Sequence, residues 1–123
     1  MMRFVVISMI CSVIALNHAQ ANEVEIVDAQ ASRGANGVYR FNVTLRHADN
    51  GWDHYADRWD VLGPKGEVLG SRVLLHPHVT EQPFTRSLSG VVIPEALKTV
   101  NIRAHDKEHG DSPEMFKVTL PGR

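Results

Sequence analysis

The sequence predicts an all-β domain, an immunoglobulin-like sandwich of about seven antiparallel strands. Short runs alternate between apolar and polar residues, turn residues separate these runs at regular spacing, and no long stretch shows the period of a helix. Trp59 lies in the third run, where immunoglobulin-like folds bury a tryptophan. The disulfide that usually packs beside it is missing, because the chain has a single cysteine. A small β-barrel is the main alternative.

The first 21 residues, which precede these runs, have the features of a signal peptide. Arg3 supplies a positive charge, residues 4–16 form an apolar run, and small residues occupy positions 19 and 21. The apolar run is too short to span a bilayer comfortably. We therefore expect cleavage after Ala21, which leaves a mature domain of residues 22–123 without a membrane span. A buried N-terminal helix is the alternative.

The only cysteine lies inside this apolar run and bears on the compartment. Ile10 precedes Cys11, whereas a lipoprotein site would need a small residue there. The mature chain would then have no thiol and no disulfide. An exported domain held together by packing alone fits a bacterial periplasm better than an animal extracellular space, where small domains usually carry disulfides. We expect a periplasmic or secreted protein.

The first half of the mature chain contains three predicted strands. Residues 24–31 form the first strand, and a turn follows at residues 34–37 because Asn and Gly tolerate positive φ. Residues 38–47 form the second strand, in which apolar and polar side chains alternate as in a strand with one buried face. A polar loop then leads into the third strand, residues 55–62, which buries Trp59.

The second half contains four more predicted strands. A tight turn at residues 63–66 leads into a strand at residues 67–75, which ends before Pro77 because proline cannot donate a hydrogen bond to a ladder. A charged loop is expected at residues 107–113. The remaining strands are predicted over residues 84–93, 99–105 and 115–120. No linker, repeat or low-complexity segment divides the chain, so one domain is expected.

Composition and motifs argue against several classes of function. The formal net charge of -1 suggests neither nucleic acid nor an anionic membrane as a partner. The chain lacks a nucleophile-elbow sequence, a phosphate-binding loop and a dinucleotide fingerprint. Histidine and aspartate could serve acid–base chemistry, but no third group completes a catalytic arrangement; an open metal site could also be catalytic. The expected function is a non-catalytic binding module.

Strand direction predicts that the histidines gather at one end of the sandwich. Seven histidines are present, and six of them follow the predicted cleavage point. If consecutive strands run up and down, the ends of the second, fourth and sixth strands lie together with the loops that follow them. These segments carry all six histidines. Chance contributes to such a grouping, because loops collect polar residues and a sandwich has only two ends.

Imidazole and carboxylate together suit a divalent metal ion such as zinc or copper(II). Copper(I) is disfavoured, because Met115 is the only methionine of the mature chain and no thiolate is present. The candidate ligands are His47, His54, His76, His78, His105 and Asp106. The residues expected to orient these ligands or to contact a partner are Asp49, Trp52, Asp53 and His109.

Two other interpretations of the same residues remain open. In the first, the histidines are purely structural and bond to backbone carbonyls or to neighbouring aspartates. In the second, the loops form a metal-free interaction module of a cell-envelope assembly, with Trp52 as an exposed aromatic anchor for an envelope protein.

The chain also resembles a family of small exported proteobacterial proteins. The resemblance rests on the runs His-Ala-Asp-Asn-Gly-Trp-Asp-His-Tyr-Ala-Asp (47–57), His-Pro-His (76–78) and Arg-Ala-His-Asp (103–106). It covers most of the mature chain, implies a periplasmic single domain and implies no activity. Periplasmic copper carriers of sandwich fold are a looser comparison, since they depend on methionine and an N-terminal histidine and this chain departs from both.

Overall fold

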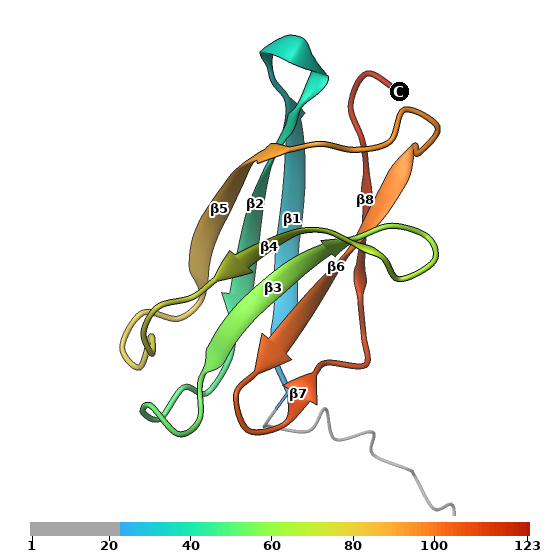
Figure 1. The fold of residues 1–123 in the computed structure, drawn as a ribbon. Coiled ribbons are helices and arrows are strands. Elements are labelled where there is room, and N and C mark those ends of the chain that lie inside the picture. Colours follow the sequence, from blue (N-terminus) through green and yellow to red (C-terminus); the bar gives the residue numbers. More distant parts are fainter. Residues whose placement is uncertain (1–22) are drawn as a thin grey trace, which may run out of the picture.

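Two antiparallel β-sheets make up the part of the chain that the computed structural model describes, residues 23–123 (Figure 1). One sheet has the strand order β1-β2-β5, and the other has the order β4-β3-β6-β7 with β8 also paired to β6. The elements are β1 (Glu25–Arg33), η1 (Ala35–Gly37), β2 (Tyr39–Arg46), β3 (Ala56–Leu62), β4 (Val68–Val73), β5 (Phe84–Val91), β6 (Thr99–Asp106), β7 (Gly110–Asp111) and β8 (Phe116–Thr119). The predicted all-β sandwich is confirmed.

All seven predicted strands are present, and the structure adds a short strand, β7, within the loop expected at residues 107–113. Because β3 occupies one edge of β6, β7 and β8 share the other edge. β8 pairs with the first half of β6 and β7 with its last two residues. A two-residue strand has no alternation that a sequence could reveal.

The turn after β3 decides which sheet β4 joins. The N–H of Gly63 bonds to the carbonyl of Glu67 at 2.8 Å, and Gly66, with a φ of 79°, donates to the carbonyl of Gly63 at 3.0 Å. A hairpin this tight makes β4 the neighbour of β3. In a constant-type immunoglobulin domain the fourth strand instead joins the sheet of the first, second and fifth strands.

The core lies between the two sheets around Trp59 of β3. This side chain is fully buried and belongs to one apolar cluster with Phe41, Val43, Val100 and Ile102, the residues expected near it. The cluster draws on both sheets, because alternation along each strand aims one face at the opposite sheet. The predicted burial of Trp59 is confirmed.

The segments that carry the histidines lie at one end of the sandwich, the lower end in Figure 1. β2 and β6 end there, β3 begins there, and the connection from β4 to β5 reaches the same end. The upper end holds η1 and the connection from β5 to β6. These segments are placed as strand direction predicts.

Replacing Trp59 by alanine should lower the free energy of unfolding by about 3–5 kcal/mol, because a large aromatic side chain leaves the core. This is a large share of the roughly 5–15 kcal/mol that stabilises a typical domain. Trp52→Ala is the matched control, since Trp52 is 61% exposed, and its cost should stay below about 1 kcal/mol. Urea unfolding followed by circular dichroism measures both changes. An unchanged midpoint for Trp59→Ala would contradict the burial of this residue.

Candidate metal centre

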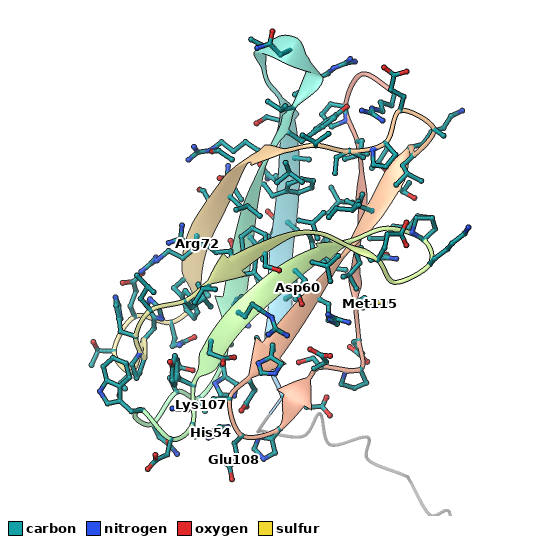
Figure 2. The ribbon with its side chains drawn as sticks, in the orientation of Figure 1. His54, Asp60, Arg72, Lys107, Glu108 and Met115 are labelled. Carbon is teal, nitrogen blue, oxygen red and sulfur yellow. The ribbon has the colours of Figure 1, made fainter. Side chains whose placement is uncertain are left out.

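The carboxylate of Asp106 is the meeting point of three histidines. Asp106 ends β6 and is 1% exposed, because it continues the inward-facing side of that strand. Its Oδ2 lies 2.7 Å from His47 Nε2, 2.8 Å from His54 Nε2 and 3.2 Å from His109 Nδ1. The three rings come from the end of β2, the start of β3 and the turn after β6, and Figure 2 shows His54 and Glu108 at this end of the molecule.

The second oxygen of Asp106 holds the turn between β6 and β7. Asp106 Oδ1 accepts the backbone N–H of Glu108 at 2.7 Å and that of His109 at 3.1 Å. Burial on its own raises the pKa of Asp106, but these two backbone bonds, together with the bonds from the His109 and His54 rings, outweigh it and lower the pKa to about 2. Asp106 is therefore an anion at neutral pH, although it is buried.

A second buried carboxylate, that of Asp49, orients His47. Asp49 Oδ1 lies 2.5 Å from His47 Nδ1 and accepts the backbone N–H of Ala56 at 2.9 Å, and Oδ2 accepts the backbone N–H of His78 at 2.8 Å. An ionised carboxylate only accepts hydrogen bonds, so Nδ1 is the nitrogen that donates to Asp49. The lone pair of a neutral His47 ring then lies on Nε2, facing Asp106.

This geometry places His47 between two carboxylates. A neutral imidazole has one N–H and can satisfy one of them. The contact between His47 Nε2 and Asp106 Oδ2 at 2.7 Å is then a hydrogen bond only if a proton lies between the two atoms, and a metal ion shared by the two groups is the alternative. His47, His54 and Asp106 offer three ligand atoms within 4.8 Å of one another, so they could hold a metal ion.

An ion would require a small expansion of this group. Zinc binds nitrogen and oxygen ligands at about 2.0–2.2 Å, so tetrahedral geometry separates two such ligands by about 3.3–3.5 Å. The distances of 2.7 and 2.8 Å from Asp106 Oδ2 to the His47 and His54 rings are hydrogen-bond distances. Both rings would have to move from Asp106 by a fraction of an ångström to admit an ion.

His76 and His78 do not join this group. The His78 ring stacks on Phe84 with 3.9 Å between ring centroids, and its Nε2 lies 2.9 Å from Arg86 Nη2. Since a guanidinium only donates, His78 Nε2 is the acceptor of that bond. His76 is exposed, and its ring bonds to the carbonyl of Pro77 at 3.0 Å. His78 contributes through its backbone N–H, which bonds to Asp49.

His105 also lies elsewhere, on the outer face of the sheet. Adjacent residues of a strand point to opposite faces, so His105 and Asp106 cannot both face the core. His105 Nδ1 lies 2.5 Å from Asp57 Oδ1. Strand alternation was available in the sequence and would have separated this histidine from the others.

The residues expected to orient ligands or to contact a partner divide into two sets. Asp49 and His109 belong to the group around Asp106 described above: Asp49 is buried, whereas the His109 side chain is 39% exposed. Asp53 and Trp52 are exposed; the Trp52 ring lies edge-on to Tyr55, and its backbone carbonyl accepts a bond from Lys107 Nζ at 2.9 Å. Glu108, which sequence reasoning did not single out, has Oε2 3.8 Å from His54 Nδ1. No spacing pattern in the sequence marks this glutamate.

A comparison with known proteins finds a relative of this chain. A "Putative lipoprotein" from Halomicrobium mukohataei is 43% identical over 88 residues, which are 72% of this chain and 43% of that protein. The chain thus spans less than half the length of this relative. No family model and no solved structure matches the chain. The relative is archaeal, so the match does not support the proteobacterial origin that the resemblance implied.

The described residues contain no helix that is long and apolar enough to cross a membrane. The predicted signal peptide, its cleavage point and Cys11 lie outside the described residues, so export of this chain stays a prediction.

The free energy of unfolding should decrease as the pH falls below 7, in part because of His78. Burial, then the Arg86 guanidinium and His76, lower its pKa below 6.5, against the weaker opposing effects of Asp49 and Glu81. The unfolded chain therefore binds a proton at this ring before the folded chain does. The stability that neutral His78 provides is fully present above pH 6.5. It is lost as the pH falls through the lower pKa that His78 has in the folded protein.

We therefore expect His78→Gln to flatten the decline in unfolding free energy between pH 7.5 and pH 5 in urea titrations. An NMR titration of the His78 ring in the wild-type protein measures the lowered pKa of His78 directly. A midpoint above 6.5 would contradict the environment described for this ring.

Proposed function

We propose that this protein is an exported, envelope-associated and non-catalytic binding module that takes up one divalent metal ion, zinc or copper(II). The ligands are His47 Nε2, His54 Nε2 and Asp106 Oδ2, and Asp49 orients His47. The observation that carries the proposal is the position of the buried His47 ring between the carboxylates of Asp49 and Asp106. A cation at Nε2 would balance the charge of these two carboxylates.

The contrast with Asp60, a third buried carboxylate, supports this assignment. Asp60 lies 2.9 Å from Arg103 Nη2 and 3.1 Å from Arg58 Nε, both permanent cations, and accepts a bond from Ser71 at 2.6 Å. In the described part of the chain, the ion-pair partners of Asp49 and Asp106 are histidines alone. A bound divalent ion would add a permanent positive charge beside these two buried carboxylates and would thereby stabilise this end.

The donor set selects the class of metal. Two imidazole nitrogens and one carboxylate oxygen suit zinc and copper(II), whereas calcium and magnesium prefer oxygen donors alone. Three protein ligands leave a further position for water or another small ligand. The envelope location rests on the predicted signal peptide and on the similarity to a protein named as a lipoprotein.

A second candidate function is a metal-free interaction module of an envelope assembly. It is favoured by exposed apolar side chains in the loops near the same end, namely Trp52, Leu75 and Val79. Exposed aromatic residues are common anchors at protein interfaces. Under this function the histidines and aspartates only hold the loops in place.

Calorimetric titration of tag-free mature protein with Zn²⁺ and Cu²⁺ tests the metal proposal. We expect a dissociation constant in the micromolar range or tighter for at least one ion. Asp106→Asn should abolish binding or weaken it more than about tenfold, because it removes the ligand charge while its Oδ1 still accepts the Glu108 and His109 N–H groups. The control His76→Gln/His105→Gln should bind like wild type. Absence of binding, or binding unchanged by Asp106→Asn, would leave the interaction module as the better description.

Asp49→Asn tests the orientation of His47 separately from the ligands. Loss of a carboxylate that orients a ligating imidazole typically weakens metal affinity by about 10- to 100-fold. We expect a loss in that range, measured by the same titration on protein shown by circular dichroism to be folded. Unchanged affinity would contradict the role of His47 Nε2 as a ligand.

A further inference from the structure

A second group of metal-binding side chains lies beside the first and shares His54 with it. It consists of His54, Glu108 and His109, whose ligand atoms lie within 4.8 Å of one another. The side chains of Glu108 and His109 are 57% and 39% exposed, whereas that of His54 is 9% exposed. This outer group therefore faces solvent, and the group of His47, His54 and Asp106 is buried behind it.

The two nitrogens of His54 face the two groups. Nε2 lies 2.8 Å from Asp106 Oδ2, and Nδ1 lies 3.8 Å from Glu108 Oε2. A separation of 3.8 Å is too long for a hydrogen bond. It is close to the roughly 3.3–3.5 Å expected between two ligands of one tetrahedral ion. Closing this gap needs only a small movement of the exposed Glu108 side chain.

His109 is prepared for a ligand role in the same way as His47. Its Nδ1 lies 3.2 Å from Asp106 Oδ2, so Nδ1 donates and the lone pair of the neutral ring lies on Nε2. The backbone N–H groups of Glu108 and His109 both bond to Asp106 Oδ1, which fixes the turn that carries the two side chains. The neighbouring cation, Lys107, is bonded to the carbonyl of Trp52. Figure 2 shows Lys107 at the same end of the molecule as His54 and Glu108.

We propose that a second divalent ion, zinc or copper(II), binds at this outer group through His54 Nδ1, the Glu108 carboxylate and His109 Nε2. The proposal rests on the function proposed above, since the inner ion occupies His54 Nε2. With both nitrogens bound to metal, the ring is an imidazolate that bridges the ions. When this imidazolate forms, His54 Nδ1 loses its proton to solvent and gains a bond to the outer ion.

Metal stoichiometry tests the second site on tag-free mature protein. Native mass spectrometry after titration with Zn²⁺ or Cu²⁺ should show two ions per chain for the wild type. Glu108→Gln/His109→Gln should retain one ion, because the inner ligands are unchanged. The matched control Glu114→Gln/His76→Gln makes the same chemical changes at exposed residues outside both groups, and it should retain two ions.

The copper-loaded protein tests the bridge itself. Two Cu²⁺ ions joined by an imidazolate couple their unpaired electrons, so the integrated EPR signal of the two-copper protein should fall well below its copper content. The Glu108→Gln/His109→Gln variant with one copper should give a signal equal to its copper content. Full signal intensity from the two-copper wild type would overturn the bridge.

The possible ion counts distinguish failure of the outer site from failure of the inner site. A single ion in the wild type that Asp106→Asn removes would overturn the outer site and leave the inner site standing. Two ions in both the wild type and Glu108→Gln/His109→Gln would place the second ion elsewhere and also overturn it. No ion at all would overturn both proposals.

Discussion

The end of the sandwich that carries the histidines depends on one buried carboxylate, that of Asp106. It bonds to three imidazoles through one oxygen and to two backbone N–H groups through the other. These five contacts hold together the end of β2, the start of β3 and the turn after β6. The hydrogen bonds outweigh the cost of burial and keep the carboxylate ionised, so the anion is a fixed feature around which the rings are arranged.

Asp49 extends this arrangement to the connection between β4 and β5. It receives bonds from the His47 ring and from the backbone of Ala56 and His78, and Gln82 links the backbone N–H of His47 to the carbonyl of His78. Residues 23–123 contain no cysteine, so these polar contacts and the core hold the loops without the help of a disulfide. A buried polar network of this kind rigidifies a structure only when its members are satisfied. In the described part of the chain, the ion-pair partners of the two aspartates in this network are histidines.

Much of the fold could be predicted from periodicity and turn chemistry. The alternation of β2, the tight turn around Gly66 and the large apolar Trp59 are local signals, and each is confirmed. The resemblance, by contrast, implied an origin that the archaeal relative does not support. Within the candidate site, strand direction placed the right segments at one end but could not say which rings meet. His47 and Asp106 are 59 residues apart, and no pattern in the chain links them.

Periods of a few residues and strand direction are enough to predict the all-β class, the inward face of β2 and the end of the sandwich to which the histidine-bearing segments belong. Only the tertiary structure decided the membership of the site. The loop conformations, set by backbone bonds to Asp49 and Asp106, bring the rings of His54 and His109 to Asp106, while the ring of His78 turns to Phe84 and Arg86. These contacts join residues distant in the chain, and their energies depend on burial, which a local pattern cannot specify.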